Sequence, residues 1–193
     1  MFTEVHQGLV AVHAVSRKEW RAWLKKNHKT ERKVWLIIYH KDAETPSVYY
    51  AEAVEEALCY GWIDSRPSKR DSESYYLTFS QRNPRSKWSK INRDRIARLL
   101  KDGLVAPAGK KMVEIAKKAG TWTALDSSDK GIIPEDLAAA FSKSKKAHEN
   151  FLKFPPGSRK VILEWVNSAK RPETRTKRIR EVVRLAAKNL RAR

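Results

Sequence analysis

The stretch Val34-Trp-Leu-Ile-Ile-Tyr-His40 decides the fold class. Its residues are almost all β-branched, aliphatic or aromatic, which is typical of a buried strand. The short β-branched run Gly8–Val15 precedes it and predicts another strand. Downstream, Trp62–Arg66 and Ser74–Phe79 predict two antiparallel strands joined by the polar turn Pro67–Glu73. The sequence therefore predicts a small, mainly antiparallel sheet in the N-terminal half of the chain.

Two helices are expected between these strands. Ser16 and Glu19 form a capping-box pair that opens a helix running to about Asn27. A second helix is expected over Tyr50–Tyr60, with Gly61 as its stop signal. Helical spacing predicts an acidic outer face on this second helix, made of Glu52, Glu55 and Glu56.

Downstream of Phe79 the sequence predicts helices throughout. They are expected at Trp88–Leu100, Ala108–Lys118, Pro134–Phe141, Ser144–Phe154, Ser158–Lys170 and Pro172–Leu190. The predicted fold class is α+β, with the sheet and its helices in the N-terminal half and an all-helical C-terminal half. The expected domains are 1–82, an α+β domain with a Gly-Trp-Ile-Asp motif, and the helical region 83–193, of which 132–193 is a basic C-terminal module.

Composition excludes several protein classes. The 193 residues include a single cysteine and carry a formal net charge of +19, so an internal disulfide scaffold is excluded. No stretch approaches the roughly 18 apolar residues of a membrane span, and the N-terminus lacks the features of a secretory signal. We therefore expect a cytoplasmic protein. The histidines show no metal-ligand spacing and no glycine-rich phosphate loop is present, so we expect no metal, no cofactor and no catalytic residue.

The positive charge is concentrated in two segments. Arg82–Lys101 holds eight basic residues and one acid, and Lys170–Arg193 holds ten basic residues and two acids. On the last predicted helix, one set of cations falls within about 80° of arc. Such a stripe can follow a phosphate backbone, although a solvated helix face has the same pattern. The candidate polyanion-binding residues are Lys177, Arg180, Arg184, Lys188 and Arg191.

A second candidate site surrounds the Gly-Trp-Ile-Asp motif. Trp62 and Asp64 point to the same side of a predicted strand, and an aromatic ring beside a carboxylate can bind a cationic or sugar-like group. The competing interpretation is a core tryptophan with Asp64 paired to Arg82 or Lys41. The candidate pocket consists of Lys41, Glu56, Trp62, Asp64, Arg82, Ser86, Trp88, Ser89 and Asn92. The alternative function is therefore a small-molecule-binding protein or an enzyme that uses this pocket.

Two smaller features belong to the same region. Ser86 or Ser89 is a plausible N-cap, and the amides behind it could bind an anion. Cys59 lies in the last turn of its helix among glutamates, where a thiolate is disfavoured. Cys59 is therefore not expected to act as a nucleophile.

The motif residues also carry a family resemblance. Ala53–Asp64, followed by Arg82 and Ser86–Asn92, resembles the bacterial YdeI/OmpD-associated family, also labelled bacteriocin-protection, and Ala169–Ile179 resembles its C-terminal module. Gln81 departs from the proline common in that family. The resemblance runs from about residue 20 to residue 190.

The resemblance implies a small bacterial protein without an established reaction, and a link to tolerance of antimicrobial peptides. Many such peptides are cationic, and a chain with a net charge of +19 would repel them. We therefore expect an indirect role for a binding protein with an anionic partner. Nucleic acid is the first candidate partner and an anionic membrane surface the second.

Overall fold

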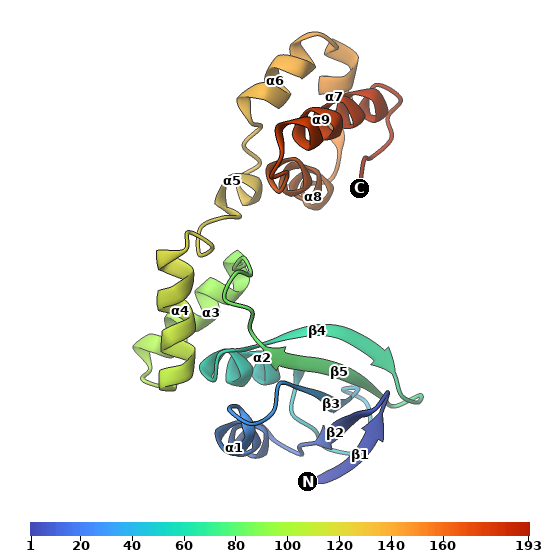
Figure 1. Ribbon diagram of the computed structural model, residues 1–193. Coiled ribbons are helices and arrows are strands. Elements are labelled where there is room, and N and C mark those ends of the chain that lie inside the picture. The colour runs from blue at the N-terminus through green and yellow to red at the C-terminus, as the bar shows by residue number, and fades with distance from the viewer. The chain divides into compact units, whose positions relative to one another are not determined.

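The computed structural model describes residues 1–193, which form two compact units, Met1–Trp122 and Thr123–Arg193. The fold is mixed α and β, with all strands in the first unit (Figure 1). One sheet has the strand order β1-β2-β3-β5-β4. The strands are β1 Phe2–His6, β2 Leu9–His13, β3 Lys33–Tyr39, β4 Trp62–Lys69 and β5 Ser74–Gln81.

The sheet is antiparallel except for the β2–β3 pair, which is parallel. The sequence predicted β2, β3, β4 and β5 close to their observed positions. It did not predict β1, an edge strand with an exposed face. Gln7 and Gly8, with φ of 49° and 74°, form the tight turn that joins β1 to β2, because positive φ at both positions suits a two-residue hairpin.

Four helices complete the first unit: α1 Arg17–Asn27, α2 Tyr50–Cys59, α3 Lys90–Lys101 and α4 Pro107–Lys118. The predicted start of α1 is confirmed, since the Ser16 hydroxyl accepts a hydrogen bond from the backbone N–H of Glu19. The predicted stop after α2 is also confirmed. Gly61 adopts a φ of 75°, and the chain then enters β4.

The helices and the sheet share one hydrophobic core. Buried side chains from α3 and α4 pack in the same cluster as those from α1, α2 and β3. The first compact unit therefore extends to Trp122, well beyond the boundary expected at residue 82. The largest fully buried members of this core are Trp20, Trp62, Trp88, Phe79, Leu24, Leu36, Leu58, Ile96 and Leu99.

The second unit is helical. Its elements are α5 Asp126–Asp129, α6 Glu135–Ser142, α7 Lys145–Lys153, α8 Pro156–Asn167 and α9 Pro172–Ala186. Its core gathers apolar residues from α6 to α9, led by Leu137, Phe141, Phe151, Ile162 and Leu163. None of the helices in the chain is both long and apolar enough to span a membrane.

The last helix is shorter than predicted. α9 ends at Ala186 rather than at Leu190, because Asn189 adopts a left-handed φ of 56° and the backbone N–H of Leu190 returns to the carbonyl of Leu185. Asparagine tolerates this conformation and commonly ends helices in this way. Lys188 and Arg191 therefore follow the helix instead of extending its face.

Candidate functional site

Two carboxylates predicted on the outer face of α2 are in fact buried. Glu55 is 9% exposed and Glu56 is 2% exposed, because α1 and α3 both pack against α2. Glu56 accepts hydrogen bonds from Arg17 Nε and Arg21 Nη1, each at 2.6 Å. Glu55 pairs with Arg17 and Arg98. The prediction that Glu55 and Glu56 lie on a solvent-exposed face is wrong. Both belong to an ion-pair network that joins α2 to α1 and α3.

Cys59 lies at the end of the same helix and is fully buried. Burial, with a smaller contribution from negatively charged Glu56, raises the pKa of the Cys59 thiol to about 11. The thiol is therefore protonated at neutral pH, which gives a poor nucleophile.

This environment makes alkylation of Cys59 a test of the packing around α2. Near pH 7.5, iodoacetamide should modify Cys59 in the folded protein at least about 100-fold more slowly than in the denatured chain, because thiolate is scarce and access is blocked. Mass spectrometry over a time course measures both rates. Comparable rates would contradict the buried, protonated thiol, and the Cys59→Ser protein controls for modification elsewhere.

The Gly-Trp-Ile-Asp motif contributes mainly to packing. Trp62 is 1% exposed, and its indole N–H donates to the carbonyl of His28 at 3.3 Å. Asp64 is half-buried and accepts a hydrogen bond from the Tyr50 hydroxyl at 3.0 Å. No ion pair joins Asp64 to Lys41 or Arg82, although its charge favours the charged form of Arg82.

Arg82 is the most unusual charged residue of the predicted cluster. It is only 6% exposed, and its guanidinium carbon lies 3.9 Å from the centre of the Trp88 ring. Nη2 donates to the carbonyl of Lys87 at 2.7 Å, whereas the buried Nε has no hydrogen-bond partner. Burial lowers the pKa of Arg82 to about 10, against the weaker opposing effect of Asp64. The side chain stays cationic at neutral pH.

The other residues of the predicted pocket form local hydrogen bonds or lie elsewhere on the surface. Ser89 is the N-cap of α3 and accepts from the backbone N–H of Asn92 at 3.3 Å. The Ser86 hydroxyl donates to the carbonyl of Asn83 at 2.7 Å. Lys41 is exposed and lines a separate hollow of about 370 Å³ beside the loop that follows β3. The nine predicted residues therefore do not line one pocket.

Two of them, Trp62 and Arg82, do line a pocket of about 510 Å³. Its other walls come from the end of α1 and from α4, which bring Lys29, Lys111 and Met112 to the same hollow. The sequence did not predict these residues. They are far apart in the sequence and belong to no motif, so only the packing of α4 on the turn at Gly61 reveals them.

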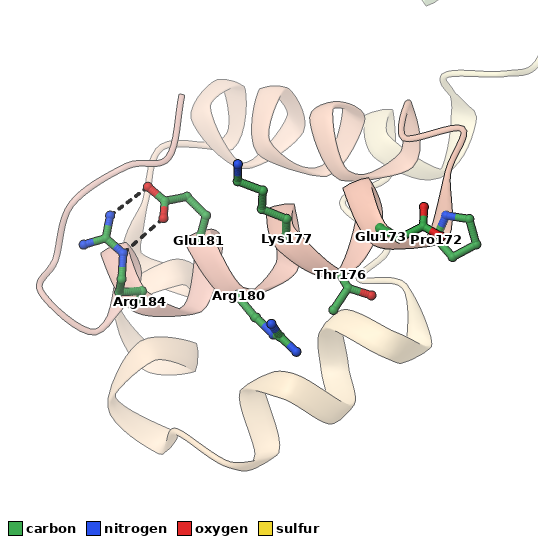
Figure 2. A pocket seen from close by; sticks show the side chains of 7 residues that line it. All are labelled: Pro172, Glu173, Thr176, Lys177, Arg180, Glu181 and Arg184. Atoms are coloured by element: carbon green, nitrogen blue, oxygen red, sulfur yellow. Dashed lines mark hydrogen bonds and ion pairs between the residues drawn. The ribbon is translucent and has the colours of Figure 1, made fainter.

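The five cations of the predicted stripe do not all lie on one helix of the second unit. Lys177, Arg180 and Arg184 are exposed on α9, and Lys188 and Arg191 follow it. Figure 2 shows Arg184 turned back onto Glu181, which it holds through two hydrogen bonds of 3.0 and 2.8 Å.

Lys177 and Arg180, at the centre of α9, form no ion pair of this kind. Figure 2 draws Lys177 and Arg180 without a paired carboxylate. They line an open hollow of about 630 Å³ along α9. Arg180 also borders a groove of about 580 Å³ between α9 and α6, which Lys143 lines as well. In that groove Asp136 is paired with Arg175, which lowers the pKa of the Asp136 carboxyl.

Comparison with known families divides the chain in a similar place. Residues 12–112 match a domain of unknown function, DUF8412, and residues 130–189 match the family described as Bacteriocin-protection, YdeI or OmpD-Associated. No curated protein and no solved structure matches the chain. The expected resemblance is thus found over residues 130–189, while the motif at 53–64 lies in the other matched region. The chain accordingly belongs to the DUF8412 family, and its second unit is similar to the YdeI/OmpD-associated, bacteriocin-protection family over residues 130–189.

Proposed function

We propose that this protein is a non-enzymatic binding protein whose second unit holds nucleic acid through its phosphates. The observation that carries the proposal is the pair of exposed, carboxylate-free cations Lys177 and Arg180 on α9, within a unit that has seventeen basic and eight acidic residues. Exposed cations that form no ion pair with a carboxylate remain available to a phosphate backbone.

Nucleic acid is the favoured partner because the basic surface is spread over several turns rather than gathered at one point. Lys177, Arg180 and Arg184 are spaced by three and four residues, so their side chains share one side of α9. Lys188 extends the positive region beyond the helix. The chain has no zinc-finger spacing and no base-stacking motif, which favours binding without sequence preference.

The link to antimicrobial peptides follows indirectly. A chain with a net charge of +19 repels cationic peptides at long range, so direct sequestration is disfavoured. Occupying an anionic target in the cytoplasm would instead remove a site to which such peptides bind. Tolerance would then depend on the same α9 cations as nucleic-acid binding.

A salt titration with DNA tests the proposal. We expect the intact protein to bind a labelled duplex of about 20 base pairs at about 50 mM salt, and more weakly at about 200 mM. Replacing Lys177 and Arg180 with glutamine should flatten the log–log salt slope by about 1.8, because each phosphate contact contributes about 0.9. Fluorescence anisotropy measures affinity and slope together.

The matched control removes two other exposed cations of the same unit, Lys153 and Lys170. The Lys153→Gln/Lys170→Gln protein has the same net charge as the α9 variant and should keep most of the original slope. Equal slopes for the two variants would show that only total charge matters. Absence of DNA binding at low salt, with binding to phosphatidylglycerol vesicles, would replace nucleic acid with a membrane surface as the partner.

A further inference from the structure

We infer that the pocket between α4 and the Gly61–Trp62 turn binds a small organic anion, a carboxylate or phosphate carried on a compact apolar body. This site lies within the first unit and is independent of the proposed nucleic-acid surface. Its volume of about 510 Å³ is in the range of small-molecule sites.

The charged residues that line the pocket favour an anionic ligand. The pocket lining includes the three cations Lys29, Arg82 and Lys111, and no aspartate or glutamate. Lys29 and Lys111 are exposed at the rim, where they can attract a ligand from solution. Arg82 is 6% exposed, so its charge acts with less screening by water than a surface charge.

Arg82 brings a buried positive charge to the pocket without an ion-pair partner. A buried N–H without a hydrogen-bond partner costs free energy, and native proteins leave few such groups. Arg82 already gives one hydrogen bond to Lys87 and stacks on Trp88, yet its Nε is unpartnered. The planar guanidinium is suited to carboxylate and phosphate oxygens. A bound anion would offset the cost of holding this charge in the interior.

The remaining walls select an apolar body. Met112, Ile115 and Ala108 come from one side of α4, and Tyr60, Trp62 and Pro84 come from the residues that flank the α2–β4 turn and β5. Met112 and Ile115 are half-buried, so they present apolar surface that a ligand could cover.

The backbone keeps these walls in place. A Cβ atom at Gly61 would lie 2.9 Å from Met112 Cγ and 3.1 Å from the Ala108 carbonyl oxygen, so the turn and α4 are in direct contact. The backbone N–H of Ala106 also donates to the Cys59 carbonyl at 3.1 Å. Because the walls are held by backbone contacts, the pocket is formed before a ligand arrives, which reduces the entropic cost of binding.

Benzoate and phenyl phosphate are suitable probes, because they join the two candidate anions to the same ring. We expect at least one of them to shift the amide NMR signals of Gly61, Arg82 and Lys111 saturably. Benzyl alcohol, which has the ring without the charge, and inorganic phosphate, which has the charge without the ring, should bind at least about 10-fold more weakly. The stronger of the two probes identifies the anion.

Adjacent lysines on α4 provide the decisive comparison. Lys111 lines the pocket, whereas Lys110 is also exposed and does not line it. Lys111→Gln should weaken binding of the preferred probe by about 3- to 5-fold, and Lys110→Gln should leave it nearly unchanged.

Several results would overturn the inference. Equal losses for the two lysine variants would indicate a general charge effect, and equal binding of benzyl alcohol would indicate an apolar hollow without anion selectivity. Saturating probe with no shift at Gly61, Arg82 or Lys111 would also overturn it. The Lys177→Gln/Arg180→Gln protein should bind the probe normally, so failure of DNA binding and failure of this site can be told apart.

Discussion

Replacing Arg17 and Arg21 together with methionine should destabilise the first unit by about 3 kcal/mol. Glu56 has 3% of its side chain exposed, and these arginines are the two residues with which it forms ion pairs. Removing both would leave a buried carboxylate without a counter-charge, which is far costlier than losing a surface ion pair. Methionine preserves most of the apolar stem of each arginine, so packing changes little.

Urea denaturation followed by tryptophan fluorescence measures this loss, because six of the seven tryptophans lie in the first unit. The matched control is Lys18→Met/Lys25→Met, which removes two exposed charges from the same helix and should change the free energy of unfolding by less than about 0.5 kcal/mol. Adding Glu56→Met to the arginine variant should recover much of the loss, because it removes the stranded charge. An unchanged midpoint for the arginine variant would contradict a structural role for the network.

The misplaced face of α2 shows where sequence patterns fail. Helical periodicity located the helix and its stop at Gly61 correctly, since both depend on neighbouring residues. The burial of Glu55 and Glu56 depends on Arg17, Arg21 and Arg98, which belong to helices remote in the sequence. A run of acidic residues is normally solvated, so nothing local distinguished this buried pair. Buried charges are predictable only once their partners have been placed.

The sequence predicted some residues of the candidate pocket and not others. Trp62 stood out because it shares a predicted strand face with Asp64, and Arg82 stood out as a possible partner of Asp64. Their association follows from the pairing of β4 with β5, which sets Trp62 opposite Gln81. Lys29 and Lys111 offered no such signal, because exposed lysines are common throughout this chain. Their contribution depends on how α4 packs against the turn at Gly61.

That packing depends on a glycine within α4. A Cβ atom added to Gly109 would lie 2.4 Å from the carbonyl oxygen of Cys59 and 2.8 Å from that of Leu58. Both obstacles are backbone atoms at the end of α2, which cannot rotate away as a side chain can. Gly109 therefore permits a close approach of α4 and α2 that no other residue allows.

Gly109→Ala should consequently destabilise the first unit by about 2 kcal/mol, even though alanine favours helix formation by about 1 kcal/mol over glycine. The comparison is Gly157→Ala in the first turn of α8, where an added Cβ meets no atom within 4 Å. That substitution should stabilise the second unit by about 0.4–1 kcal/mol, because it restricts the unfolded chain without a clash. Tryptophan fluorescence during urea denaturation reports the first change, and thermal melting by circular dichroism reports the second. If both substitutions raised the free energy of unfolding, helix propensity would dominate at Gly109. The close contact between α4 and the end of α2 would then not be the constraint that holds α4 against the Gly61–Trp62 turn and shapes the pocket.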